Sequence, residues 1–452
     1  MVPHSRCSLH TWRSASGRHC TSCSPSHQRK VTSVSPEQSA VALPITELND
    51  DTEHWSGAVW VGQIDDRDIT SGSIHLTQGG SFNSARLLVW NADTPRGFVE
   101  VPVSDGMVDG AELAARVSQL PSVTPESQAP EPPFSVILCT KDRPGQLRDT
   151  LGSLVELNYP AFEIVVVDNA PASGLTPPVV AEFASRGVRI VQAARRGLAV
   201  ARNVGIESAR HEFIAFTDDD VLVDPRWLKN LARGFARATD VSCVTGMVPT
   251  AEVLTPAQSY FDNRVGWASQ CRPEIYTMAN PPKDDPLFPL GVARFGTGAN
   301  IAFRRSAIRR LGGFDEGMGV GSPTGGGEDI DMFVRVLLAG QTLAYEPGAL
   351  VWHRHRKSLE DLEVQIYNYG LGLGAWITKL MLRPRTFVLV ARRGIAGLAH
   401  LRRITVVENS GAMPDTLEGL TKLERRGVLA GPRALLRSRL DGRSATPLLV
   451  KS

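Results

Sequence analysis

The chain has 452 residues, of which 42% are hydrophobic and 21% are charged, and its 49 basic and 47 acidic side chains leave a net charge of +2. This composition excludes a wholly disordered chain, and the near-neutral balance argues against nucleic acid as a partner. Six cysteines are too few for a disulfide framework in a chain of this length. We expect two or three domains with sizeable buried cores.

The sequence predicts no membrane-spanning helix. The best candidate, Val364–Thr378, contains glycines and amide side chains and is shorter than the roughly 20 apolar residues that a spanning helix needs. The N-terminus also lacks the apolar core of a signal peptide. We therefore expect a cytoplasmic protein, with contact to the inner face of a membrane as an open alternative.

The first 44 residues are predicted to be unstructured. They are rich in Ser and His, their first acid is Glu37, and they show no apolar periodicity that would support packing. A transit peptide is an alternative reading of this composition. A zinc site around Cys20 and Cys23 is another, although a single C-x-x-C pair is a weak signal.

A small β-rich domain is predicted for residues 45–120. Short hydrophobic runs alternate there with Gly and Asp clusters, and apolar residues at helical spacing from Asp109 to Leu120 predict a closing helix. No catalytic group stands out, so we expect a packing or docking role. Five prolines in residues 121–133 predict a linker to the next domain.

After the linker, apolar runs alternate with helical patterns, which predicts an α/β fold with a parallel sheet. Ligands of such sheets bind at the carboxyl ends of the strands. Thr140, Asp168 and the triplet Asp218–Asp220 all follow such runs directly. The predicted strands are Ser135–Thr140, Glu163–Asp168, Val188–Val191 and Glu212–Thr217.

Two groups of residues suggest a metal site. The adjacent carboxylates of Asp218–Asp220 repel one another unless water or a cation compensates them, and a hard divalent ion is a natural partner. His353 and His355 alternate on a strand-like run, so both rings would share one face. A solvated acidic turn and a pair of surface histidines are the simpler alternatives.

Two further groups suggest a base and an anion site. Glu328 and Asp329 follow three glycines and open a predicted helix, where acids either complement the helix dipole or supply a general base. Arg195 and Arg196 precede a glycine turn and a helix start, which suits a diphosphate. Arg202 has a structural ion pair as its alternative role.

Six short motifs occur in one order along the chain, and together they resemble family 2 of the glycosyltransferases over roughly residues 134–356. The resemblance implies the GT-A nucleotide-sugar-binding fold, a mixed and mostly parallel sheet with flanking helices. It also implies transfer with inversion of the anomeric configuration and a divalent metal, Mn²⁺ or Mg²⁺. The motifs are Cys139–Pro144, Val167–Asn169, Arg196–Asn203, Thr217–Asp220, Gly296–Asn300 and Gly327–Asp329.

The resemblance further implies a role for each matching residue. Asp329 would be the general base, with Glu328 beside it. The metal ligands would come from Asp218, Asp219, Asp220, His353 and His355. The nucleotide-sugar donor would be bound by Thr140, Asp142, Arg143, Asp168, Arg202, Asn203, Asp218 and Gly298. The acceptor would be a carbohydrate or a lipid-linked molecule.

A helical and basic region is predicted for residues 357–452. A helical apolar period begins at Leu359 and is expected to break at Tyr369–Gly372. From Lys379 onward, 15 Lys and Arg face only five Asp and Glu. Such a segment is typical of either a helix on an anionic membrane or a helical cap with a solvated basic face.

Two other functions compete with glycosyl transfer. A sugar nucleotidyltransferase would need a Gly-rich basic loop after the first strand, where the sequence has Lys141–Pro144 instead. A non-catalytic nucleotide-sugar-binding protein would be favoured if Asp329 or the Asp218–Asp220 triplet were missing, and both are present.

Overall fold

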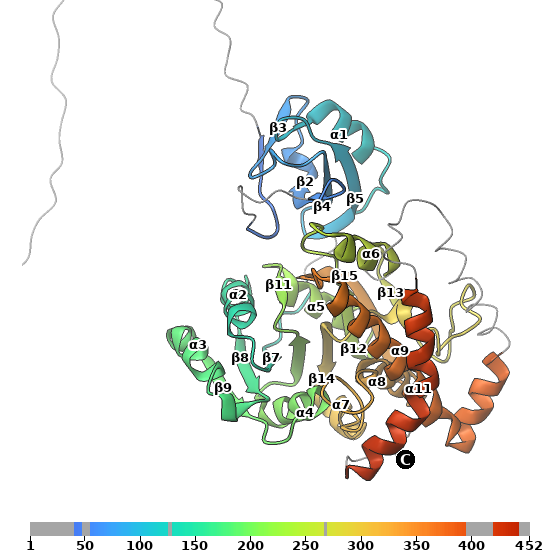
Figure 1. Ribbon diagram of the computed structural model, residues 1–452. Coiled ribbons are helices and arrows are strands. Elements are labelled where there is room, and N and C mark those ends of the chain that lie inside the picture. The colour runs from blue at the N-terminus through green and yellow to red at the C-terminus, as the bar shows by residue number, and fades with distance from the viewer. Residues whose placement is uncertain (1–39, 48–54, 125–128, 266–268, 395–418, 443–452) are drawn as a thin grey trace, which may run out of the picture. The chain divides into compact units, whose positions relative to one another are not determined.

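The computed structural model of the protein describes residues 40–47, 55–124, 129–265, 269–394 and 419–442 (Figure 1). Most of the segment expected to be unstructured, together with the Cys20 and Cys23 cluster and the proposed transit peptide, lies outside the described residues. The expectation was wrong at residues 40–42, because Ala40–Ala42 forms strand β1 and pairs in parallel with β3, beginning at Ala40 and Ile74.

The small N-terminal domain contains two three-stranded sheets, ordered β1-β3-β6 and β2-β4-β5. Their inner faces bury Trp60, Leu87 and Val89 in one hydrophobic core. The helix expected from Asp109 onward begins at Gly110, because the Asp109 carboxylate accepts hydrogen bonds from the first free backbone N–H groups. The elements are β2 (Trp60–Asp65), β3 (Ser73–Leu76), β4 (Ser84–Asn91), β5 (Thr94–Pro102), β6 (Met107–Asp109) and α1 (Gly110–Val117).

The large domain is built on one mixed sheet with the order β11-β15-β12-β14-β10-β7-β8-β9, and β13 pairs with β15 beside this path. Strands β10, β7, β8 and β9 are joined in parallel, as predicted, whereas β14 runs antiparallel to both of its neighbours. The strands are β7 (Phe134–Thr140), β8 (Phe162–Asp168), β9 (Val188–Gln192), β10 (Phe213–Thr217), β11 (Val221–Val223), β12 (Val241–Met247), β13 (Glu274–Tyr276), β14 (Asn300–Arg304) and β15 (Thr342–His353).

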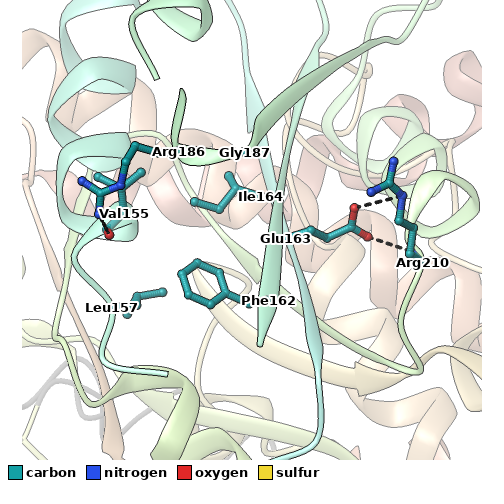
Figure 2. A pocket seen from close by; sticks show the side chains of 8 residues that line it. All are labelled: Val155, Leu157, Phe162, Glu163, Ile164, Arg186, Gly187 and Arg210. Atoms are coloured by element: carbon teal, nitrogen blue, oxygen red, sulfur yellow. Dashed lines mark hydrogen bonds and ion pairs between the residues drawn. The ribbon is translucent and has the colours of Figure 1, made fainter. Parts of the chain in front are cut away.

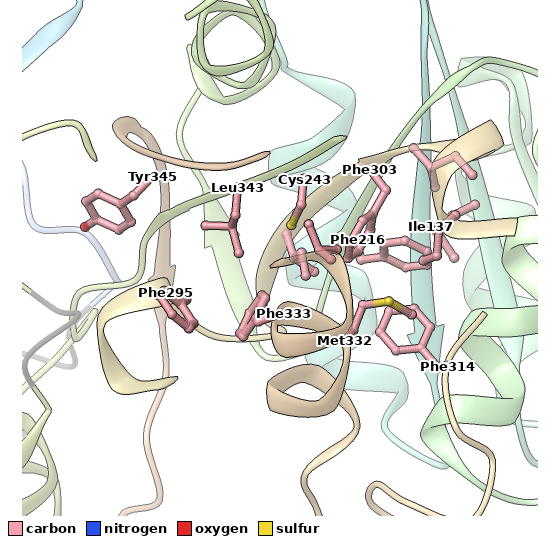
Figure 3. Close-up of a cluster of buried hydrophobic side chains, with 14 of the residues drawn as sticks. Ile137, Phe216, Cys243, Phe295, Phe303, Phe314, Met332, Phe333, Leu343 and Tyr345 are labelled. Atoms are coloured by element: carbon pink, nitrogen blue, oxygen red, sulfur yellow. The ribbon is translucent and has the colours of Figure 1, made fainter. Parts of the chain in front are cut away.

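Both faces of this sheet are covered, which explains why its strands read as continuous apolar runs. Val136 and Leu138 of β7 pack on α2, α3 and α5, while Ile137 between them packs on α4 and α8 on the opposite face. Figure 3 shows Phe333 and Met332 of α8 packed into this second core. The helices are α2 (Pro144–Val155), α3 (Thr176–Glu182), α4 (Leu198–Ser208), α5 (Trp227–Ala236), α6 (Pro256–Arg264), α7 (Arg305–Arg310) and α8 (Glu328–Leu338).

The small domain packs directly against the large one. The guanidinium of Arg226 lies 3.6 Å from the ring centroid of Trp90, and the Lys229 ammonium lies 2.6 Å from the Asp93 carboxylate. Arg86 also forms an ion pair with Asp262.

The C-terminal region forms a pair of closely packed helices, α9 (Leu359–Met381) and α11 (Leu420–Leu440). The break expected at Tyr369–Gly372 was wrong, because α9 continues through it. Its glycines allow close helix contact instead: a Cβ at Gly370 would lie only 2.1 Å from the Glu424 carbonyl oxygen of α11. No helix within the described ranges is long and apolar enough to cross a membrane.

Replacing Gly374 of α9 with alanine is expected to destabilise the protein by about 1–3 kcal/mol, because the new Cβ would lie 2.1 Å from the Val428 carbonyl oxygen. Gly152 of α2 is a matched control: it is also helical and has no atom within 4 Å of the added Cβ. Gly152→Ala should stabilise the protein by roughly 0.5–1 kcal/mol through helix propensity alone. Urea unfolding of both variants measures the difference, and equal effects would contradict the proposed close packing.

Candidate active site

The parallel strands bring the predicted polar residues together at one edge of the sheet. Thr140 ends β7, Asp168 ends β8, and the triplet Asp218–Asp220 follows β10. Because β7 lies between β8 and β10, these ends are neighbours. The hydroxyl of Thr140 donates a hydrogen bond of 2.6 Å to the Asp219 carboxylate, which links two of the motifs directly.

A candidate metal site lies beside this edge. Oxygen atoms of Asp218 and Asp220 and a ring nitrogen of His353 all lie within 4.8 Å of one another. Strand β15 brings His353 there, because its last residues pair with β11, which follows the triplet directly. Two carboxylates and one imidazole are suitable ligands for Mn²⁺ or Mg²⁺, with coordination positions left for donor oxygens.

The electrostatics of this cluster favour cations. Burial lowers the pKa of His353, but the Asp220 carboxylate, 3.3 Å from Nε2, outweighs it and the pKa is raised. Burial raises the pKa of Asp220, but the charges of His353 and Arg143 outweigh burial and hold this pKa below the usual range. Two arginines, Arg143 and Arg356, also lie within ion-pair distance of Asp220. The cluster therefore has protein cations that a metal ion would partly replace.

The other two residues expected near the metal lie elsewhere. Asp219 points toward Thr140 and Arg143 rather than toward His353, and burial, followed by the neighbouring Asp220 charge, raises its pKa to about 6. His355 is stacked behind His353 at a ring distance of 4.6 Å. Its other side contacts Phe261 at 4.3 Å, so it supports His353 and does not join the group of potential ligands.

Glu328 and Asp329 open α8, as predicted. Gly327 before them has a φ of 94°, which is readily accessible to glycine. Asp329 is half-buried and accepts a 2.9 Å hydrogen bond from the backbone N–H of Gly298. Two predicted motifs that are distant in sequence therefore meet at the Asp329 carboxylate.

Glu328 lies on the protein side of Asp329. It is 5% exposed and pairs with Arg202 at 3.0 Å. Burial, followed by the nearby Asp329 charge, raises the pKa of Glu328 to about 7 even though Arg202 opposes the shift. Glu328 is therefore shielded from solvent, and Asp329 is the more accessible carboxylate.

Arg202 and Asn203 hold motifs together. Arg202 is 2% exposed, and its guanidinium contacts Glu328, Asp218 and the Gly298 carbonyl oxygen. This geometry matches the structural ion pair that the sequence left open. Asn203 exchanges two hydrogen bonds with the backbone of Phe314, so its amide supports a loop.

Asp168 and Asp142 differ in their surroundings. Asp168 is fully buried, and one of its oxygens accepts the Ala170 N–H at 2.9 Å. Its other oxygen has no hydrogen-bond partner among the described residues. Asp142 is exposed, and its φ of 57° turns the chain between β7 and α2.

A buried ionic network behind the site was missed by the sequence analysis. Asp331 of α8 pairs with Arg335 at 2.8 Å and with Lys379 of α9 at 2.7 Å. Lys379 also pairs with Asp315, which in turn pairs with Arg439 of α11. The i,i+4 spacing of Asp331 and Arg335 was the available signal. The network joins the C-terminal helices to the helix that carries Asp329.

The hollow drawn in Figure 2 is not part of this site. It has a volume of about 410 Å³ and is lined by Phe162, Glu163 and Ile164 at the beginning of β8. Asp168 lies at the other end of the same strand. The hollow therefore opens at the opposite edge of the sheet from the candidate active site.

Residues 135–312 match the model of the family described as Glycosyl transferase family 2. The pre-mycofactocin glycosyltransferase of Mycobacterium tuberculosis is 33% identical over 175 residues, which are 39% of this chain and 34% of that protein. The succinoglycan biosynthesis protein ExoM of Rhizobium meliloti is 29% identical over 230 residues, 47% of this chain and 64% of that protein. A solved mannosyltransferase of Pyrobaculum calidifontis, in complex with GDP-Man and Mn²⁺, is 18% identical with a TM-score of 0.43, covering 70% of this chain and 90% of that one.

This matched segment is similar to the family 2 glycosyltransferases, in agreement with the resemblance seen in the sequence motifs. The chain spans about a third of the length of the Mycobacterium tuberculosis relative. The family match includes the strand ends and Gly298, and it stops before Glu328, Asp329 and His353. Glu328 and Asp329 are brought to the site by α8, and His353 by β15.

Replacing Glu328 with glutamine is expected to flatten the pH dependence of stability. The raised pKa of Glu328 means that the folded state favours its protonated form. This contribution is fully present below the ordinary glutamate pKa and is lost as the pH rises through about 7. We expect a difference on the order of 1–3 kcal/mol. Urea unfolding of wild type and variant from pH 5 to 8 measures it, and parallel curves would contradict the assigned shift.

Proposed function

We propose that the protein is an inverting, metal-dependent glycosyltransferase that moves a sugar from a nucleotide-diphosphate sugar to an acceptor hydroxyl, with Asp329 as general base. One observation carries the proposal. The Asp329 carboxylate is held by the Gly298 N–H, while Arg202 ties the Gly298 carbonyl to Asp218 of the metal cluster. Three hydrogen bonds therefore connect the proposed base to the proposed metal site.

The chemistry follows from this arrangement. Asp329 takes the proton of the acceptor hydroxyl as its oxygen forms a bond to the anomeric carbon, and the bond from that carbon to the diphosphate breaks. A divalent ion would stabilise the leaving diphosphate as a Lewis acid, held by Asp218, Asp220 and His353. A single displacement from the face opposite the leaving group inverts the anomeric configuration.

The proposal also covers donor and acceptor. We propose that Asp168, one oxygen of which has no partner within the described part of the chain, accepts a hydrogen bond from the nucleotide base. Several relatives are named for polysaccharide synthesis, including ExoM and poly-beta-1,6-N-acetyl-D-glucosamine synthase of Staphylococcus epidermidis. We therefore propose a carbohydrate acceptor, free or lipid-linked. Activity on the cytoplasmic side, at the inner membrane face for a lipid-linked acceptor, is part of the same proposal.

Donor binding tests this proposal before any acceptor is known. The purified protein is mixed with a panel of nucleotide sugars, with and without Mn²⁺, and binding is followed by thermal shift and calorimetry. We expect one class of nucleotide sugar to bind in a Mn²⁺-dependent way. Formation of pyrophosphate from a nucleoside triphosphate and a sugar phosphate would instead favour a sugar nucleotidyltransferase. Binding without any turnover across acceptors would favour a non-catalytic binding protein.

A further inference from the structure

The outer face of α11 combines basic and apolar side chains. Three leucines on this face are largely exposed: Leu429 at 81%, Leu436 at 61% and Leu440 at 78%. Their spacing of seven and four residues places them on one side of the helix. Five exposed basic residues share that side at helical intervals, namely Lys422, Arg425, Arg426, Arg433 and Arg437.

The contacts that hold α11 in the fold lie on the other side of the helix. The inner face of α11 packs on α9 through glycine contacts, with a Cβ at Gly431 only 2.3 Å from the backbone nitrogen of Ala375. Ser438 and Arg439 on the inner side bind Gly317 and Asp315. The leucines that remain outside therefore add nothing to these contacts.

The charge on the outer face is of one sign. The one acid within α11 is Glu424, which is partly buried and pairs with Arg264 of α6. An occupant of the face therefore has to supply negative charge and also accept leucine side chains. The surface of an anionic bilayer offers both, since its headgroups attract Lys and Arg and its acyl boundary takes up apolar side chains.

We propose that the outer face of α11 docks the protein on an anionic membrane surface. The helix would lie in the plane of the surface, with the three leucines in the acyl boundary and the basic side chains among the headgroups. Docking on a membrane would bring the active site to a lipid-linked acceptor. This link to an acceptor rests on the proposed function. Binding to vesicles itself does not require transfer activity.

Sedimentation of the full-length protein with vesicles tests the surface. We expect binding to phosphatidylcholine vesicles that contain phosphatidylglycerol, weakening with salt, and no binding to phosphatidylcholine alone. Arg433→Gln with Arg437→Gln should lower the affinity about 30-fold, because each basic residue near the surface contributes roughly 1 kcal/mol of binding free energy. Arg148→Gln with Arg186→Gln removes the same charge from an exposed region on α2 and beyond α3, and it should leave binding unchanged.

A second variant tests the exposed leucines of α11. Leu429→Ser with Leu436→Ser should weaken binding to the anionic vesicles while leaving the melting temperature unchanged, since both side chains are exposed. No binding to anionic vesicles at low salt would overturn the proposal, as would equal losses in the two arginine pairs. A dimer that Leu436→Ser dissociates would assign the face to a second copy of the chain. Donor binding, measured in parallel, separates failure of this surface from failure of the proposed activity.

Discussion

Replacing Asp329 with asparagine is expected to slow sugar transfer by about 100- to 10,000-fold, which is the usual contribution of a general base. The asparagine keeps the size of the side chain but has no basic oxygen for the acceptor proton. Donor binding should stay close to that of the wild type, because the candidate metal ligands Asp218, Asp220 and His353 are untouched. Initial rates with saturating donor, together with calorimetry of donor binding, measure both quantities.

Glu328→Gln is the matched control for this experiment. It makes the same chemical change on the neighbouring residue, whose carboxylate is 5% exposed and pairs with Arg202. We expect a smaller loss of transfer than for Asp329→Asn. A larger loss in the Glu328 variant would move the base to that residue, and unchanged turnover in the Asp329 variant would refute the assignment.

Replacing Asp218 and Asp220 together with asparagine is expected to lower metal affinity by at least about 100-fold. Residues that only support metal ligands are typically worth about 10- to 100-fold, so the loss of two charged ligands should exceed that range. Because the variant no longer binds the metal, the donor binding that depends on the metal should also be lost. Calorimetry with Mn²⁺, in the presence and absence of donor, gives both affinities.

Asp219→Asn provides the comparison within the same triplet. Its carboxylate contacts Thr140 and Arg143 and lies outside the group of potential ligands. The expected result is a Mn²⁺ affinity within a few-fold of the wild type, with a change mainly in stability. If Asp219→Asn removed metal binding as completely as the double variant, the ligand set would have to be revised.

Metal binding is also expected to depend on pH. The Asp220 carboxylate raises the pKa of His353, and the protonated ring is unable to bind a metal ion. Affinity should therefore fall as the pH drops through this raised pKa, by up to about tenfold per pH unit for one displaced proton. His353→Gln should remove this dependence. Mn²⁺ titrations between pH 6 and 8 measure the slope, and a wild-type affinity that does not change over this range would exclude His353 as a ligand.

The strand ends could be predicted from sequence for a clear physical reason. Strands buried on both faces are continuous apolar runs, so the first polar residue after each run marks the edge where ligands bind. Thr140, Asp168 and the Asp218–Asp220 triplet were located in this way and do meet. The helix start at Glu328 was also visible, because three glycines precede it.

The directions of individual side chains were not predictable. Adjacent residues in an extended or turning segment point to different sides. The sequence of the triplet alone therefore does not tell which carboxylate points away from the candidate metal site. Asp219 turns toward Thr140 because its neighbour on β7 supplies a hydroxyl, which is a tertiary contact. His355 was likewise expected beside His353 at the metal, but β15 ends at His353 and His355 packs on Phe261.

The C-terminal helices show a second limit of sequence reasoning. Glycine lowers helix propensity, so Gly370 and Gly372 suggested a break. In the structure, close contact with α11 and with the Gly326 loop compensates for this weakness, and both contacts are distant in sequence. The buried Lys379 was hidden for the same reason, because its partners Asp315 and Asp331 come from other elements.

The most direct test of the proposed function is acceptor-dependent release of nucleoside diphosphate from a nucleotide sugar, measured side by side for the wild type and Asp329→Asn. The panel of donors is assayed with Mn²⁺ and with carbohydrate acceptors. We predict that one donor class supports release by the wild type, that chelation of the metal abolishes it, and that Asp329→Asn loses most of it. Release that is independent of Asp329 and of the metal would contradict the proposal.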